Sequence, residues 1–255
     1  MKIFFVVVLS LITTTAALAQ KDSTNHTKDS TVHAAKPAKK DWSKVLLGGG
    51  PADHFLIQFG YSSWSAVPDT IHITGFCRSF NFYFMFNFPF KTDPRLSVGA
   101  GLGIGWANVY FDKQEVLIAA LNPTLAFPNE AASDHFKKYK LVSSFLDLPI
   151  ELRFALDPEH MNSSWKFAVG TKVGLLLTSY TKAKDFQNVN NQDINNYIQK
   201  NVSNRYFNAY QFAATVRISY GVIGVYGQYQ LNPLIKTVAG PNVYPYEIGL
   251  VISGL

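Results

Sequence analysis

The sequence predicts an all-β fold, an eight-stranded antiparallel transmembrane up-and-down β-barrel, from three observations. Between Phe76 and Phe90 a phenylalanine stands at nearly every second position, with polar residues among those in between. A later segment, Leu146 to Phe154, alternates apolar with charged residues. Because successive side chains of a strand point to opposite faces, both segments read as strands with one entirely apolar face. The connections between predicted strands also alternate in length.

The amino-terminal part is predicted to lie outside the barrel. Residues 1–19 read as a signal peptide, with Lys2, an apolar run from Ile3 to Ile12 and the small-x-small ending of Ala17 to Ala19. A retained anchor is the alternative, but the run is shorter than the roughly 20 residues of a spanning helix. Residues 20–50 are rich in Lys, Ser, Thr, Asp and Asn and predict a disordered periplasmic tether. The barrel domain is predicted over 51–255.

The predicted strands cover approximately 53–63, 75–89, 96–111, 139–155, 165–180, 206–219, 222–231 and 244–254. In the third, apolar residues from Val98 to Trp106 alternate with four glycines, Gly99, Gly101, Gly103 and Gly105. Glycine weakens a strand unless a neighbour needs the space. The crowded interior of a narrow barrel needs it.

The fourth strand decides between a dry core and a hydrated interior. Its apolar face carries Leu146, Leu148, Ile150, Leu152 and Phe154, and its other face carries Asp147, Pro149, Glu151 and Arg153. The charged face suits a hydrated barrel interior, so the apolar face is expected to contact lipid. Pro149 removes a ladder donor in a fold without edges, and therefore predicts a bulge or local kink.

Connection lengths predict the orientation. The links after the second, fourth and sixth strands are short, and those after the first, third, fifth and seventh are long. Outer-membrane barrels alternate short periplasmic turns with longer external loops in this way. Within the long loops, the capping-box spacing of Asp112 and Glu115 predicts a short helix, and the spacing of Ile194, Tyr197 and Ile198 predicts a second.

Composition fits an exported β protein and excludes nucleic-acid binding. Aromatic residues are 15% of the chain and charged residues only 16%. Without Lys2 the formal charge is +5, from 22 Lys and Arg against 17 Asp and Glu, and residues 20–50 hold +3 of it, from six Lys and three Asp. The barrel is therefore near neutral and has no basic patch of the size that nucleic acid needs. The single cysteine, Cys77, excludes an internal disulfide.

The run Leu146-Asp147-Leu148-Pro149-Ile150-Glu151-Leu152-Arg153-Phe154 resembles a strand motif of the PorT-like outer membrane β-barrel proteins of Bacteroidetes. Gly60, Phe88-Pro89-Phe90 and the segment Gly170 to Gly174 fit the same resemblance, which covers about Leu56 to Leu255. It implies a barrel in the cell outer membrane that serves a secretion or surface assembly. Such chains usually close with an aromatic residue that the barrel-insertion machinery reads, whereas this one ends in Leu255.

Charged residues of inward parity form the first candidate site, a lumen charge network of Asp147, Glu151, Arg153, Lys166, Lys172 and Arg217. Antiparallel pairing is expected to bring Asp147 or Glu151 opposite Lys172. One interpretation is an interior salt-bridge ladder that fills the barrel, since eight strands leave room only for side chains and unpaired buried charges are costly. The other interpretation is a path for a ligand or a proton.

Two cations of outward parity form the second candidate site. Arg78 and Lys140 stand near the external ends of their strands, where a long side chain reaches the headgroup level. The expected partner is a phosphate of lipopolysaccharide, and the alternative is a pair of unpaired rim cations.

Enzyme signatures are sparse. The histidines are dispersed and no pair has metal-ligand spacing, so no catalytic residue, metal or cofactor is predicted. The sequence favours a non-enzymatic barrel with a structural or interaction role, in contact with outer membrane lipid, lipopolysaccharide, the barrel-insertion machinery and an envelope protein partner. The alternatives are a barrel that binds or transports a small ligand or solute, and a lipid A-modifying enzyme using Ser62, His72 and His135 at the external rim.

Overall fold

The computed structural model describes residues 54–254, so the predicted signal peptide and tether lie outside the described residues. The described chain forms nine strands and one short 3-10 helix. They are β1 (Phe55–Ser65), β2 (Arg78–Pro89), β3 (Leu96–Phe111), β4 (His135–Ala155), η2 (Met161–Ser163), β5 (Trp165–Gln187), β6 (Asp193–Val202), β7 (Tyr210–Tyr220), β8 (Ile223–Gln230) and β9 (Tyr244–Ser253). No helix among these residues is long and apolar enough to cross a membrane.

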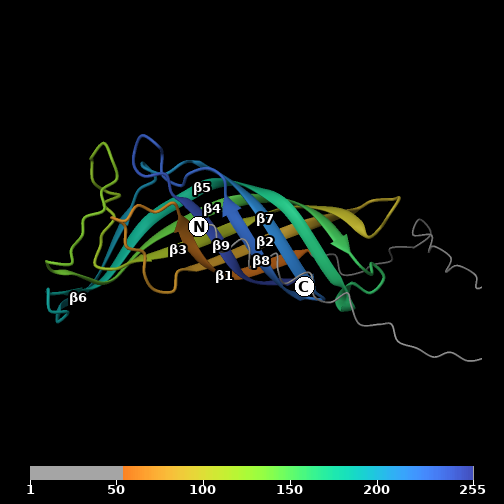
Figure 1. The fold of residues 1–255 in the computed structure, drawn as a ribbon, viewed down its shortest axis with the longest axis horizontal. Helices are drawn as coiled ribbons and strands as arrows, with labels where there is room; N and C mark the ends of the chain where they lie inside the picture. Colours follow the sequence, from red (N-terminus) through yellow and green to blue (C-terminus); the bar gives the residue numbers. More distant parts are fainter. Residues whose placement is uncertain (1–53, 255) are drawn as a thin grey trace, which may run out of the picture. The chain divides into compact units, whose positions relative to one another are not determined.

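Eight of the strands close into a ring. The hydrogen-bonded order runs from β4 through β3, β2, β1, β9, β8 and β7 to β5, and the pairing of β4 with β5 closes it. Every pairing between these strands is antiparallel. The ninth strand, β6, pairs only with the part of β5 from Tyr180 to Gln187, at the end where the long loops gather (Figure 1). The predicted eight-stranded antiparallel barrel is confirmed.

Apolar side chains face outward from this ring. On β2, Phe82 is 39% exposed and Phe88 is 58% exposed, whereas the alternating Tyr83 and Met85 are 2% and 0% exposed. Leu148, Ile150 and Leu152 of β4 are likewise exposed, and Asp147 and Glu151 are buried. The apolar face of the strands therefore covers the outside of the barrel, and this arrangement agrees with the predicted lipid-facing surface.

The glycine row of β3 makes room for large interior side chains. A Cβ on Gly99 would lie 2.5 Å from the guanidinium of Arg153, and one on Gly105 would lie 2.8 Å from a carboxylate oxygen of Asp147. A Cβ on Gly103 would meet the ring of Tyr83. The missing side chains of β3 thus allow the inward groups of β2 and β4 to cross the barrel.

An apolar cluster closes the end of the barrel that carries the long connections, 66–77, 112–134, 188–209 and 231–243. It includes Trp64, Phe111, Val116, Ile118, Phe145 and Ile235, which come from three strands and two of these loops and are each at most 6% exposed. We call this group the mouth cluster. The short connections, 90–95, 156–164 and 221–222, lie at the other end of the barrel (Figure 1). In outer-membrane barrels the long-loop end is external.

The two helices predicted in the loops are wrong. The segment after Asp112 is a run of turns held by an isolated bridge between Gln114 and Asn129, and its apolar residues Val116 and Ile118 are buried in the mouth cluster. The second segment is strand β6. In both places, pairing and packing against the barrel override the local helical pattern, because short helices gain little stability from sequence alone.

The bulge predicted at Pro149 is also wrong. The ladder between β4 and β5 runs without a register shift through Leu148, Pro149 and Ile150. Toward β3 the pairs at Leu148 and Pro149 are missing, but the register is the same on both sides of the gap. A gap of two residue pairs toward β3 therefore accommodates the proline. The register shift of β4 lies instead between Ser144 and Phe145.

Candidate functional site

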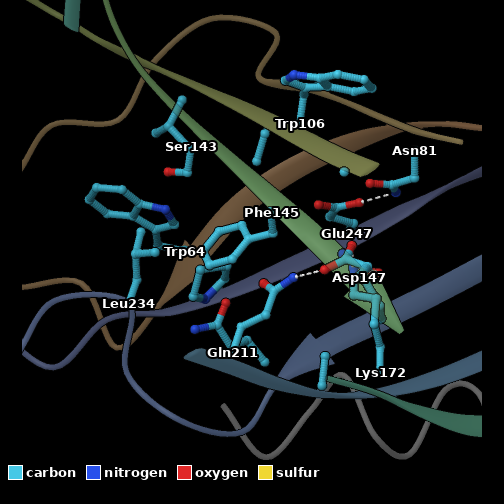
Figure 2. A pocket seen from close by; sticks show the side chains of 17 residues that line it. Trp64, Asn81, Trp106, Ser143, Phe145, Asp147, Lys172, Gln211, Leu234 and Glu247 are labelled. Atoms are coloured by element: carbon cyan, nitrogen blue, oxygen red, sulfur yellow. Dashed lines mark hydrogen bonds and ion pairs between the residues drawn. The ribbon is translucent and has the colours of Figure 1, made fainter. Parts of the chain in front are cut away.

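The predicted lumen charge network, called the interior network from here on, has two halves, and the first surrounds Asp147. Its carboxylate lies 3.1 Å from the ammonium of Lys172 and accepts a hydrogen bond from Gln211 Nε2 at 2.6 Å (Figure 2). It also accepts a hydrogen bond from Tyr83 Oη at 3.1 Å. The Lys172 ammonium also donates to Gln228 at 2.9 Å. Asp147 is fully buried and Lys172 is 2% exposed. Each charge thus has an opposite charge and neutral polar groups around it.

Glu247 of β9 belongs to the same half of the network, and the sequence analysis missed it. Its carboxylate accepts hydrogen bonds from Asn81 Nδ2 at 3.0 Å and Tyr226 Oη at 3.3 Å, and Glu247 is 5% exposed. The available signal was parity, because Glu247 alternates with the exposed Ile248 and Leu250.

The second half of the interior network lies nearer the short turns. Glu151 Oε2 accepts from Arg217 at 2.8 Å and from Arg153 at 3.0 Å. All three side chains are less than a tenth exposed, and so is Lys166 on the same interior face. Five of the six residues predicted for the lumen therefore pair as neighbours in two groups. Asp147 pairs with Lys172, and Glu151 pairs with both arginines.

Two small cavities lie inside the described barrel. One cavity of about 30 Å³ lies between the mouth cluster and Asp147, lined by Trp64, Phe145, Gln211 and Glu247 among others (Figure 2). A second, of about 10 Å³, lies beside Glu151 and Arg217. A single water needs roughly 10–15 Å³ of such volume. These spaces therefore fit water molecules and no larger solute.

Cys77 is part of the mouth cluster, so its accessibility tests whether the cluster closes this end of the barrel. The thiol is fully buried there and accepts a hydrogen bond from the Tyr110 amide at 3.3 Å. Burial raises the pKa of the Cys77 thiol, and the thiolate is the reactive form.

We expect maleimide to label Cys77 of the folded barrel at pH 7 more than about tenfold more slowly than in the unfolded chain. A cysteine at the exposed Ala132, in a Cys77→Ser background, is the control and should label fast in both states. Equal rates for folded and unfolded Cys77 would mean an open mouth.

The second predicted site lies on the outer surface. Arg78 is exposed and Lys140 is half-buried. The Lys140 ammonium donates to Asn108 Oδ1 at 2.8 Å and lies 5.7 Å from the centre of the Tyr110 ring. The Arg78 guanidinium lies 6.0 Å from the centre of the same ring. The structure therefore brings the two cations together around one tyrosine.

The residues considered for a lipid A-modifying enzyme do not form a catalytic arrangement. Ser62 is buried and its hydroxyl has no hydrogen-bond partner among the described residues. His135 bonds instead to Asn191 Oδ1 at 3.2 Å and to the carbonyl of Ser133 at 3.0 Å. His72 is exposed. No base therefore contacts the hydroxyl.

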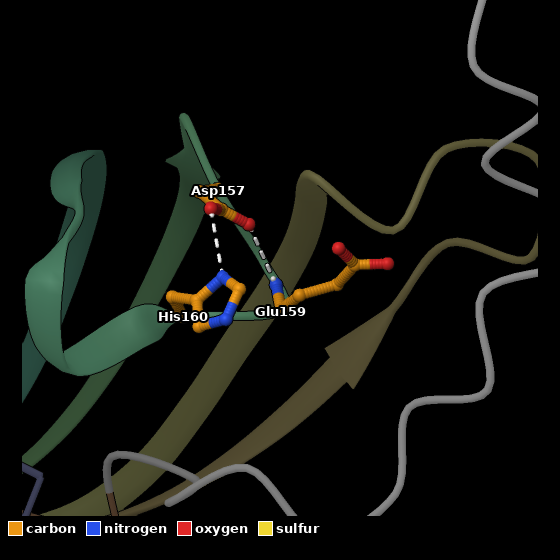
Figure 3. Close-up of side chains that lie close together, drawn as sticks. All are labelled: Asp157, Glu159 and His160. Atoms are coloured by element: carbon orange, nitrogen blue, oxygen red, sulfur yellow. Dashed lines mark hydrogen bonds and ion pairs between the residues drawn. The ribbon is translucent and has the colours of Figure 1, made fainter.

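Asp157, Glu159 and His160 gather in the turn between β4 and β5 (Figure 3). Asp157 accepts hydrogen bonds from His160 Nδ1 at 3.1 Å and from the Glu159 amide at 3.0 Å. The bond from His160 lowers the pKa of Asp157. These contacts account for the cluster as a turn motif, since an Asp side chain commonly caps the backbone two residues on. We assign no metal to it.

The interior network, the outward apolar face and the closed ring agree with the comparison to known families. The family described as outer membrane protein beta-barrel domain matches residues 19–237. The chain belongs to this family. Its members' defining feature, a barrel in the outer membrane, therefore holds for this chain.

No curated protein matches this chain. Among solved structures it is similar to Ail, the attachment invasion locus protein of Yersinia pestis, at 10% identity and a TM-score of 0.34. That match covers 78% of this chain and 94% of the Ail chain. The assignment to the family rests on the family match and the closed ring of strands.

Proposed function

We propose that this protein is a non-enzymatic outer-membrane barrel with a structural or interaction role, sealed rather than conducting. One observation carries the proposal: the interior is filled at two levels. The interior network occupies the centre through Asp147, Lys172, Glu151 and Arg217, and the mouth cluster covers it on the long-loop side.

Filling at two levels argues against a solute path. A hydrated ion or small solute requires a continuous wet channel, whereas the described cavities have volumes of about 30 and 10 Å³. Opening a path would also separate Lys172 from Asp147, and unpaired buried charges are strongly unfavourable. The alternative of a transport barrel therefore has less support than a sealed one.

Conductance in planar bilayers tests the proposal. The purified full barrel, inserted at single-molecule level, should give no current steps above the empty bilayer, while a general porin in the same lipid serves as positive control. Discrete steps from the wild-type barrel would overturn the sealed state and favour the transport alternative.

For the biological setting, we propose a role beside a secretion or surface assembly, with an envelope protein as partner, insertion by the barrel-insertion machinery and a periplasmic amino-terminal tether. The support is the resemblance of Leu146 to Phe154 to PorT-like barrels. Crosslinking in native outer membranes, through cysteines placed at exposed loop positions such as Ala132, should recover one dominant protein partner. Recovery of lipid alone would contradict this role.

A further inference from the structure

Four strands present a straight row of side chains on the outer face at the long-loop end. Tyr110 of β3 lies directly opposite Lys140 of β4, Lys140 opposite Lys182 of β5, and Lys182 opposite Lys200 of β6. Directly paired residues of antiparallel strands share one face of the sheet. The three lysines and Tyr110 therefore share the outward face, the face that Leu148 and Ile150 occupy farther along β4.

The Arg78 guanidinium of β2 lies beside the ring of Tyr110, and the ring of Tyr180 of β5 lies beside Lys200. The Lys200 ammonium lies 4.3 Å from the centre of the Tyr180 ring. We call Arg78, Lys140, Lys182 and Lys200 the cation row. Its members come from four strands, so their positions are fixed by the barrel wall and the β5–β6 ladder rather than by a loop.

No acidic side chain neutralises the cation row within residues 54–254. None of its four members has a carboxylate oxygen within 4.0 Å there, whereas neighbouring Lys184 lies 3.6 Å from Asp185 and Lys137 lies 3.8 Å from Asp193. Like charges directly opposite each other on adjacent strands destabilise a sheet. The pairs Lys140–Lys182 and Lys182–Lys200 thus carry a cost that the described chain does not offset.

The position of the cation row along the strands can be compared with the edge of the apolar, lipid-facing surface. Outward apolar residues of β4 extend to Leu146, and the stacked rings of Phe80 and Trp106 stand at the level of Ser144 by register. Lys140 stands four residues beyond Ser144, which at about 3.4 Å per residue is roughly 14 Å along a tilted strand. The cation row therefore lies outside the hydrocarbon, at the level of headgroups and their sugars, on the side that the family's topology makes external.

We propose that the cation row is a docking site for the phosphate groups of a phosphorylated glycolipid in the outer leaflet. Ammonium and guanidinium groups form short charge-assisted hydrogen bonds with phosphate oxygens, and the planar fork of Arg78 suits two of them at once. The inference deepens the proposed function by naming a lipid partner, and it rests on that function only for the outer-membrane setting.

Lipid retention by the full barrel tests the proposal. The protein is inserted into vesicles that contain either bis-phosphorylated lipid A or its dephosphorylated form, then re-extracted in mild detergent and analysed for bound lipid by mass spectrometry. Wild type should retain the phosphorylated lipid at least about tenfold better than the variant with Arg78, Lys140, Lys182 and Lys200 all changed to Gln, since several charge-assisted contacts are lost. It should show no such preference for the dephosphorylated lipid.

The controls separate charge from folding and from the sealed state. Changing Lys91, Lys113, Arg205 and Lys236 to Gln removes the same charge elsewhere and should leave retention unchanged. Changing the three lysines of the cation row to Arg should preserve it, and excess inorganic phosphate should not displace the lipid. Heat-modifiable migration in gels verifies that each variant is folded. Three outcomes would overturn the proposal: equal retention by wild type and the Gln variant, equal retention of the two lipids, or displacement of the lipid by free phosphate. Conductance, which tests the sealed barrel, is measured separately.

Discussion

Replacing Asp147 with Leu is expected to lower the free energy of unfolding by about 3–5 kcal/mol, because it removes the only carboxylate of the described residues within 4.0 Å of the buried Lys172 ammonium. Lys172 is 2% exposed and would keep only Tyr83 and Gln228 as polar partners. Urea unfolding of the barrel in lipid vesicles, followed by tryptophan fluorescence, measures the loss. The variant should also migrate as an unfolded chain at a lower temperature.

The double variant Asp147→Leu with Lys172→Met is the matched comparison. Removing both charges eliminates the unpaired ammonium, so part of the lost stability should return, while the Glu247 carboxylate keeps only its neutral partners Asn81 and Tyr226. Lys137→Ala, which breaks a pair whose side chains are 48% and 47% exposed, should cost no more than about 1 kcal/mol. A loss below about 1 kcal/mol for Asp147→Leu alone would mean that water solvates Lys172 freely. In that case the interior is wet and the sealed-barrel proposal fails with it.

The sequence was sufficient to predict the faces of the strands. A period of two in β2 and β4 assigns Phe82 or Ile150 to one face and Tyr83 or Asp147 to the other, whatever the loops do. The same parity placed Glu151, Arg153 and Arg217 inside. The number of strands in the ring and the alternation of loop lengths followed from the sequence, since glycine, proline and polar residues interrupt each apolar pattern.

The cation row shows where parity stops being sufficient. Arg78 and Lys140 were predicted, because their strands keep one register toward β3. Lys182 was missed because the predicted fifth strand ended at residue 180, whereas β5 continues to Gln187. The register of β5 against β4 also shifts between Ser144 and Phe145. Before that irregularity the odd residues of β5 face outward, and after it the even residues do. Beyond such an irregularity, the residues of the strand that would have faced inward face outward, and the reverse. The local sequence does not show where the irregularity lies.

Long-range packing accounts for the other failures. Val116 and Ile118 have an apolar pattern that suits a helix, but their environment is the barrel mouth, built from residues distant in the chain. Strand β6 forms because β5 continues beyond the ring and offers it a partner edge. The hydrogen bonds of Tyr83 and Tyr226 to interior carboxylates depend on cross-barrel distances, which no local pattern encodes.

Ile150→Arg is expected to destabilise the folded barrel in vesicles by about 2–4 kcal/mol, the cost of a cation on the lipid face near the bilayer centre. Ile150 stands in the middle of the outward apolar residues of β4 and is 52% exposed. In a water-soluble fold a side chain with that exposure would face solvent, and an arginine there would change stability by no more than about 0.5 kcal/mol. Urea unfolding in vesicles of a lipid with a normal hydrocarbon thickness measures the difference.

Ile198→Arg provides the control for Ile150→Arg, because Ile198 of β6 is 57% exposed but lies beyond the ring of strands, outside the lipid band. The same substitution there should be nearly neutral. The comparison isolates the environment, since residue type, strand conformation and exposed fraction are closely matched. Equal effects at the two positions would show that the outward apolar face does not contact hydrocarbon. The orientation of the charges inside the ring would then need a different explanation, because a barrel in water has no reason to keep Asp147 and Lys172 in and Ile150 out.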